Sequence, residues 1–228
     1  MKRNKKYKEI GVIAEELQPP FRFQVLEAYK TARTNLSFSI VKDGCKKIVV
    51  TSPLQKEGKT TNSVNIALTL AEQLNTKVLL MDCDLRNPKV DKFFSSSCLF
   101  GLSDYLTNDK PLEDIICDTD KDSLKVIFSG PTPPNPSEIL ADTQMKNLLD
   151  ALEKDFDYVI MDTPPLNIVI DSLPIVKISD GVVISVVQSE SKHGAIEKIL
   201  YTLKSIDAKV LGFILIGDKK PNRRFILN

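Results

Sequence analysis

The segment from Ser52 to Thr61, with the sequence SPLQKEGKTT, constrains this chain more than any other. It follows an apolar run at residues 48–50 and precedes a helix-like run at residues 63–74. A strand, a tight loop and a helix in that order let backbone N–H groups and a helix N-terminus surround a phosphate group. We expect Lys59 to reach the β- and γ-phosphates of a nucleotide and the Thr60 hydroxyl to bind Mg²⁺. The predicted phosphate-binding residues are Gln55, Lys56, Glu57, Gly58, Lys59, Thr60 and Thr61.

A Gly-Lys-Thr triplet also occurs in ordinary turns, so this segment alone leaves both interpretations open. Two further segments, at residues 78–86 and 158–165, each carry an apolar run that ends in aspartate. Such runs are typical of buried parallel strands, whose carboxyl ends form the ligand-binding edge of the sheet. Asp82, Asp84 and Asp162 would lie at that edge, where carboxylates hold Mg²⁺ directly or through water. Each aspartate could instead start a loop or cap a helix.

Three motifs together resemble those of the bacterial tyrosine kinases (BY-kinases). The sequence LLMDCDLR at residues 79–86 is similar to the second Walker-type motif of that family, and IMDTPP at residues 160–165 is similar to its Walker B motif. The sequence SGPTPPNPSE at residues 129–138 is similar to another segment of the family. The resemblance runs from about residue 27 to residue 212 and is greatest to the stand-alone cytoplasmic kinases of Gram-positive capsule and exopolysaccharide systems.

This resemblance implies ATP and Mg²⁺ as cofactors and a catalytic group of Lys59, Asp82, Asp84 and Asp162. The metal would be held by Thr60, Asp82 and Asp162, while Asp84 would support the metal or the base. By analogy with the family, Asp82 is the favoured acceptor of the tyrosine hydroxyl proton, although the sequence leaves open which aspartate is the base. Arg86 would orient Asp84 or meet an adjacent subunit, and a surface salt bridge is the plainer alternative.

A helix is expected over residues 23–40, and Glu27, Lys30 and Arg33 share one face of it because they are spaced by three. A solvated charged face is the default interpretation. The resemblance implies instead that this face assembles subunits into a ring, and the predicted interface residues are Glu27, Lys30, Arg33 and Arg86. Lys30 stands where the family has arginine, and lysine lacks the planar fork that binds a carboxylate in two places.

Three further departures from the family pattern bear on function. Lys56 replaces a glycine, which could take a positive φ, so either the loop path differs or Lys56 adds charge beside the phosphates. Ile216 stands where the family often has an asparagine that contacts the base. Residues 219–228 contain no tyrosine, whereas the family ends in a tyrosine cluster that a neighbouring subunit phosphorylates. The chain is therefore truncated, acts on other proteins, or is a degenerate relative.

The fold class expected is α/β, with a mostly parallel sheet flanked by helices on both faces, like that of P-loop NTPases. We expect strands at residues 46–51, 77–82, 124–128, 157–161, 181–187 and 209–216. We expect the other helices at residues 60–74, 102–107, 142–154, 170–179 and 193–205. The predicted organisation is a basic N-terminal arm at residues 1–22, a single P-loop kinase domain at residues 23–218 and a short tail at residues 219–228.

Composition excludes some classes of protein. The net charge of +1 argues against a nucleic-acid partner. No apolar run approaches the roughly 18 residues of a membrane-spanning helix. The only histidine, His193, makes a histidine-based triad improbable and is expected to open a surface helix. The cysteines lack metal-ligand spacing and are expected to be reduced, packed thiols: Cys45, Cys83, Cys98 and Cys117.

Three functions are compatible with these features. The resemblance favours an ATP-dependent protein tyrosine kinase that regulates capsular or extracellular polysaccharide biosynthesis. The second is a partition- or division-site-type ATPase, a nucleotide-gated binding switch of the same fold, although such proteins carry a second lysine early in the loop where this chain has Leu54. The third is a non-catalytic relative that binds nucleotide weakly.

The resemblance also implies partners. These are the cytoplasmic tail of a transmembrane polysaccharide co-polymerase that activates the kinase, protein tyrosine substrates, and further copies of the chain in a ring. The expected location is the cytoplasm, with recruitment to the inner face of the membrane through the partner. The basic residues 2–8 would either touch anionic lipid or form a solvated terminus.

Overall fold

The computed structural model describes residues 19–94, 98–108, 110–188, 191 and 193–217. Most of the predicted N-terminal arm and the whole tail at residues 219–228 lie outside the described residues. The first helix, α1 (Pro19–Ser39), begins four residues before the expected Phe23, so residues 19–22 belong to it. A proline is well tolerated at the first turn of a helix, because the N–H group that it lacks would have no partner there.

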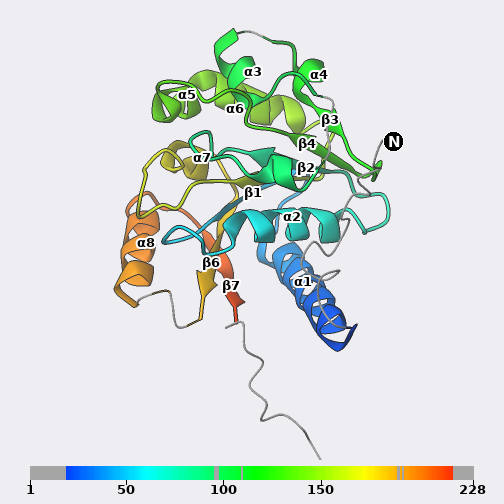
Figure 1. Cartoon of the computed structure of the whole chain (residues 1–228), viewed down its shortest axis with the longest axis vertical. Helices are drawn as coiled ribbons and strands as arrows, with labels where there is room; N and C mark the ends of the chain where they lie inside the picture. The colour runs from blue at the N-terminus through cyan, green and yellow to red at the C-terminus, as the bar shows by residue number, and fades with distance from the viewer. Residues whose placement is uncertain (1–18, 95–97, 109, 189–190, 192, 218–228) are drawn as a thin grey trace, which may run out of the picture.

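One seven-stranded sheet forms the centre of the described structure, with the order β3-β4-β2-β5-β1-β6-β7 (Figure 1). Only the short β3 runs antiparallel to its neighbour. The fold predicted from the sequence is therefore confirmed, and all six expected strands are present. The strands are β1 (Lys46–Thr51), β2 (Val78–Asp82), β3 (Cys117–Asp118), β4 (Leu124–Ile127), β5 (Tyr158–Asp162), β6 (Gly181–Val187) and β7 (Val210–Ile216).

Helices cover both faces of this sheet, and α1 and α2 lie together on one side of it (Figure 1). The remaining helices are α2 (Lys59–Leu70), α3 (Leu102–Asn108), α4 (Leu112–Ile115), α5 (Pro136–Ala141), α6 (Thr143–Leu152), α7 (Leu173–Lys177) and α8 (His193–Ser205), with a 3-10 turn at Val90–Lys92. His193 opens α8 at the surface, as expected. None of the described helices is both long and apolar enough to cross a membrane.

Two apolar cores lie on opposite faces of the sheet because side chains alternate along each strand. In β2, Leu79 and Met81 join the core under α6 and α3, whereas Val78 and Leu80 join the core under α1 and α2. Strands buried on both faces read as continuous apolar runs, which is why they could be located from the sequence.

The short elements were missed. β3, α4 and α5 have two, four and six residues, too few for a periodic apolar pattern to emerge. The expected helix at residues 170–179 shrinks to Leu173–Lys177. The expectation that every cysteine is a free thiol was wrong for one pair. Cys98 and Cys117 form a disulfide across 19 residues, because the loop after residue 97 returns beside β3, whereas Cys45 and Cys83 are free and buried.

Candidate active site

The order of the strands brings the predicted site together. β5 lies between β1 and β2, so the loop after β1 and the ends of β2 and β5 meet at one edge of the sheet. Asp82 and Asp162 are register partners in β2 and β5, and Val50 of β1 is the partner of Asp162 on the other side. The two aspartates therefore stand level with each other, next to the start of the phosphate-binding loop.

The phosphate-binding loop takes the tight path that its sequence predicted. Gly58 has a φ of 69°, and Lys56 has a φ of 65°, so lysine adopts the left-handed conformation in which the family has glycine. The Cβ atom of Lys56 makes this conformation cost roughly 1 kcal/mol locally, and whether Lys56 adds charge beside the phosphates stays a prediction. Gln55 and Lys56 are exposed, whereas Glu57, Lys59 and Thr60 are buried.

Ile216, at the end of β7, packs against this loop. A Cβ atom on Gly58 would lie 2.3 Å from Cδ1 of Ile216, so a larger residue here would have to displace the end of that side chain as well as adopt a positive φ. The residue that stands where the family often has its base-contacting asparagine therefore contacts the phosphate-binding loop itself.

Lys59 lies among all three aspartates. Its Nζ atom donates a hydrogen bond of 2.7 Å to Oδ2 of Asp84, and both side chains are more than nine-tenths buried. Burial lowers the pKa of Lys59, but the negative charges of Asp162, Asp84 and Asp82 outweigh this effect and raise the pKa above its ordinary value. The ammonium group is therefore firmly charged and placed to neutralise a polyphosphate.

Asp82 is held by the backbone. Its Oδ1 accepts from the N–H of Asp84 at 3.1 Å, and its Oδ2 accepts from the N–H groups of Lys89 and Val90 at 3.1 and 3.0 Å. Burial, followed by repulsion from Asp162, raises the pKa of Asp82 to about 7. A carboxyl group with such a pKa changes its protonation near neutral pH, which suits a general base.

Asp162 has one satisfied oxygen and one free oxygen. Its Oδ1 accepts from the Ser63 hydroxyl at 3.0 Å, while the buried Oδ2 has no hydrogen-bond partner among the described residues. Burial raises the pKa of Asp162, and the charge of Lys59 opposes that rise. An oxygen atom that is buried, unpaired and next to the phosphate-binding loop fits a Mg²⁺ ion or its water, since Mg²⁺ typically takes only one or two carboxylates from a protein.

The four predicted interface residues are all engaged within the chain. Lys30 pairs with Glu27 at 2.8 Å on the exposed face of α1. Nη1 of Arg33 donates to the carbonyl oxygen of Thr69 at 2.9 Å, near the end of α2 that is opposite to Lys59. These three residues therefore lie apart from the aspartates, and their role between subunits stays a prediction.

Arg86, the fourth of these residues, contacts Asp171 instead of Asp84. Its Nε atom donates to Oδ2 of Asp171 at 2.5 Å, and the Ser137 hydroxyl donates to Oδ1 of the same carboxylate. Burial raises the pKa of Asp171, but the hydrogen bonds from Arg86 and Ser137 outweigh it and leave the pKa below its ordinary value. This contact joins the loop after β2 to the loop after β5 and to α5.

Sequence reasoning missed Ser63 and Asp171. The spacing of four residues between Lys59 and Ser63 could have indicated that both face the site from the first turn of α2. Asp171 gave no signal, because it lies in an irregular segment whose position depends on the packing of α5 and α7.

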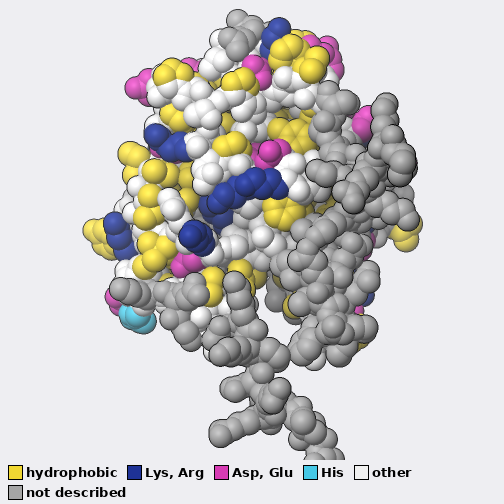
Figure 2. Space-filling view, in the orientation of Figure 1, with side chains coloured by type: hydrophobic (Ala, Val, Ile, Leu, Met, Phe, Trp, Pro, Cys, Tyr) yellow, Lys and Arg dark blue, Asp and Glu magenta, His cyan; other side chains and the backbone are white. Residues whose placement is uncertain are grey.

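The surface around the site carries basic side chains. Figure 2 shows Lys and Arg side chains crossing the middle of the visible face, over the region of β1 and β2, with an acidic side chain beside them. Such a field favours the approach of an anionic ligand.

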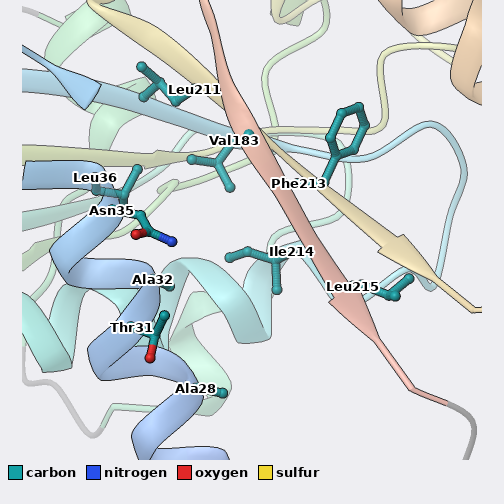
Figure 3. Close-up of a pocket in the computed structure, with 11 residues that line it drawn as sticks. Ala28, Thr31, Ala32, Asn35, Leu36, Val183, Leu211, Phe213, Ile214 and Leu215 are labelled. Carbon is teal, nitrogen blue, oxygen red and sulfur yellow. The ribbon is translucent and has the colours of Figure 1, made fainter. Parts of the chain in front are cut away.

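A separate groove of about 280 Å³ lies between α1 and β7. Ile214 extends from β7 toward α1 across it (Figure 3). No residue of the predicted nucleotide site lines this groove, so the nucleotide is not expected there. The residues that line it are Ala28, Thr31, Ala32, Asn35, Leu36, Val183, Leu211, Gly212, Phe213, Ile214 and Leu215.

Comparisons with known proteins agree with this geometry. The family model described as "AAA domain" matches residues 45–214. The chain is 36% identical over 190 residues to tyrosine-protein kinase CpsD of Streptococcus agalactiae, and the match covers 83% of this chain and 82% of that protein.

Solved structures give the same result. The chimerical protein CapA2B2 matches with a TM-score of 0.78 at 33% identity, covering 85% of this chain and 84% of that one. The kinase domain of the Escherichia coli tyrosine kinase ETK matches with a TM-score of 0.85 at 28% identity, covering 98% of this chain and 85% of that one. A plasmid partition protein from Borrelia burgdorferi, with a TM-score of 0.65 at 22% identity over 79% of this chain and 82% of that one, shares the fold alone. The chain belongs to the bacterial tyrosine kinases, a family built on the P-loop NTPase fold.

Proposed function

We propose that this chain is an ATP-dependent protein tyrosine kinase that regulates the synthesis of capsular or extracellular polysaccharide. The observation that carries the proposal is the level pairing of Asp82 and Asp162 beside Lys59 at one edge of the sheet. Transfer of a phosphoryl group needs a cation for the phosphates, an oxygen ligand for a metal and a base for the attacking hydroxyl. These three kinds of group converge here.

Each group has a distinct part in the proposed reaction. Lys59 and the loop amides hold the phosphates, and Thr60 and Asp162 hold Mg²⁺. Bound Mg²⁺ supplies positive charge next to the phosphoryl group that is transferred. Asp82 accepts the proton of the tyrosine hydroxyl, whose unperturbed pKa is about 10. A base with a pKa near 7 takes that proton more readily than an ordinary aspartate would.

Asp84 has a supporting part in this proposal. It neutralises Lys59, and it releases that lysine when the phosphates arrive. Asp82 remains the base because burial and the charge of Asp162 raise its pKa more than its three hydrogen bonds from backbone N–H groups lower it.

The acceptor tyrosine is proposed to lie on other proteins. Tyr29 and Tyr158 are packed between elements of the fold. Tyr201 is 77% exposed but belongs to the regular helix α8, which holds its backbone away from an extended path into the site.

We further infer that the kinase assembles into a ring through α1 and is activated by the cytoplasmic tail of a transmembrane co-polymerase, which recruits it to the inner face of the membrane. The exposed Glu27 and Lys30 support the first part, since they are accessible to a neighbouring subunit. The family relationship supports the second part.

Phosphotyrosine mapping after incubation with ATP and Mg²⁺ tests the proposal. Wild type and Lys59→Met are compared with and without the tail of the partner. Phosphotyrosine in wild type alone, increased by the tail, supports a kinase. Release of free phosphate without phosphotyrosine supports a nucleotide-gated ATPase, and neither product supports a non-catalytic relative.

A further inference from the structure

Three hydrogen bonds connect helix α1 to the phosphate-binding loop. The Tyr29 hydroxyl on α1 donates to Oδ1 of Asn62 on α2 at 2.7 Å. Nδ2 of Asn62 donates to Oγ of Ser185 on β6 at 2.7 Å. The Ser185 hydroxyl donates in turn to the backbone carbonyl oxygen of Glu57 in the loop. Four elements that are far apart in the sequence are thus joined by one continuous chain of polar groups.

The direction of every bond in this chain is fixed. The carbonyl oxygen of Glu57 can only accept, so the Ser185 hydroxyl must donate to it. The Ser185 oxygen then accepts from the amide nitrogen of Asn62, and this contact turns the amide oxygen of Asn62 toward Tyr29. Tyr29 must therefore donate, and burial raises the pKa of its phenol so that the proton stays in place. None of these three hydrogen bonds can exchange its donor and acceptor without leaving another polar group without a partner.

Asn62 and Ser185, in the middle of these hydrogen bonds, are buried, so an unsatisfied polar group there would be costly. Ser185 is fully buried and Asn62 is 1% exposed. A buried polar group that loses its partner costs roughly 1–3 kcal/mol. Loss of the Tyr29 hydroxyl would therefore leave the amide oxygen of Asn62 without a hydrogen-bond partner. This would favour a rotation of the Asn62 side chain away from Ser185.

The last of the three hydrogen bonds, from Ser185 to the carbonyl oxygen of Glu57, matters for phosphate binding. A trans peptide points its N–H opposite to its C=O. When Ser185 holds the carbonyl oxygen of Glu57, the N–H of Gly58 is turned away from Ser185, which leaves this loop amide available to a phosphate oxygen. The Glu57 side chain adds a second restraint, since its Oε2 accepts from the N–H of Leu54 at 2.6 Å.

We propose that Tyr29 is a positioning residue that holds the phosphate-binding loop in its nucleotide-competent shape through Asn62 and Ser185. This inference rests on the proposed nucleotide site and adds a regulatory connection to it. Any change in how α1 packs, including one caused by a neighbouring subunit, would reach the loop through this chain. By reciprocity, a bound nucleotide would tighten the packing of α1.

The test compares two tyrosine variants that each remove one hydroxyl near α1. Tyr29→Phe removes the hydrogen bond from α1 to Asn62. Tyr158→Phe is the matched control, because its hydroxyl lies 3.5 Å from Oγ of Ser37 on the same helix but leads to no loop residue. Both variants keep the aromatic ring. Hydrogen exchange of the amides at residues 54–58 is measured in the nucleotide-free protein, together with the affinity for MgADP.

We expect Tyr29→Phe to weaken MgADP binding by roughly fivefold, which corresponds to one hydrogen bond of about 1 kcal/mol. It should also speed exchange at residues 54–58, while Tyr158→Phe stays close to wild type in both readouts. Ser185→Ala should have an effect at least as large, and the double variant Tyr29→Phe/Ser185→Ala should be no worse than Ser185→Ala alone, because both act through one chain.

Equal behaviour of Tyr29→Phe and Tyr158→Phe in both readouts would overturn the proposal, and so would additive effects in the double variant. The kinase proposal fails separately, when wild type makes no phosphotyrosine. Hydrogen exchange in the nucleotide-free protein still decides on Tyr29 in that case, since it needs neither nucleotide nor transfer.

Discussion

The ammonium group of Lys59 lies 2.7 Å from the carboxylate of Asp84, and both are buried at the nucleotide edge of the sheet. Asp84 and the β- and γ-phosphates of a bound nucleotide would compete for the positive charge of Lys59. We therefore propose that Asp84 is an internal substitute for phosphate on Lys59 and that a bound nucleotide displaces it.

Asp84→Asn tests this exchange. Breaking a buried ion pair leaves a charge without its partner, and we expect the nucleotide-free variant to lose up to about 3 kcal/mol of stability, because Asp162 still compensates part of the charge. Added MgADP should raise the unfolding temperature of the variant more than that of wild type, since no internal carboxylate competes. Thermal unfolding with and without MgADP measures both effects. An equal ligand-induced shift in the two proteins would contradict the exchange.

The raised pKa of Asp82 predicts a pH dependence of stability. The pKa of Asp82 is about 7 in the folded protein, against an ordinary value of 3.8. Between these values the folded state binds more protons than the unfolded chain, so stability falls as the pH rises from about 4 to about 7 and levels off above it. Asp82→Asn should flatten this slope. Asp150→Asn, which removes an exposed carboxylate from α6, serves as the control for lost charge.

Denaturant unfolding across this pH range measures how the free energy of unfolding changes with pH. This slope is compared between the two proteins in place of the absolute stability, because asparagine cannot accept hydrogen bonds from all three backbone N–H groups and the variant is destabilised at every pH. An unchanged slope in Asp82→Asn would contradict the assignment. The rate of phosphoryl transfer to tyrosine should show the opposite pH dependence and rise through about pH 7, because the base must be ionised to accept a proton.

Lys56 gives a prediction about stability alone. Its φ of 65° lies in the left-handed region, where a side chain is strained and glycine is not. Lys56→Gly should therefore stabilise the protein by up to about 1 kcal/mol. Gln55→Gly, at the neighbouring exposed position that needs no positive φ, should be neutral or destabilising. Chemical denaturation of both variants distinguishes them, and a Lys56→Gly protein no more stable than Gln55→Gly would show that the loop is not strained at residue 56.

The contact between Gly58 and Ile216 predicts a compensating pair. Gly58→Ala should destabilise the protein by roughly 2 kcal/mol, since alanine at position 58 would be strained at a φ of 69° and its methyl group would have to displace the end of the Ile216 side chain. Ile216→Ala should restore part of this loss in the double variant by removing the overlap, while the backbone strain remains. A double-mutant cycle of unfolding free energies measures the coupling, and strictly additive losses would mean that the two residues do not touch.

The sequence predicted what depends on local pattern. The three central strands could be located because each is a run of apolar residues buried on both faces, and the carboxyl ends of parallel strands necessarily share an edge. Lys59, Asp82 and Asp162 could therefore be brought together without coordinates.

Contacts between distant segments could not be predicted in this way. Arg86 pairs with Asp171, which lies 85 residues away in an irregular segment. The disulfide between Cys98 and Cys117 depends on how one loop returns to the edge of the sheet. Tyr29 looked like an ordinary residue of a charged helix, because its role depends on Asn62 and Ser185, which belong to other elements.

A structure of the protein with Mg²⁺ and a non-hydrolysable ATP analogue tests the central claim most directly. We predict that Nζ of Lys59 leaves Asp84 for the β- and γ-phosphates and that Oδ2 of Asp162 faces the metal or its water. A triphosphate bound elsewhere, with Lys59 still paired to Asp84, would contradict the account.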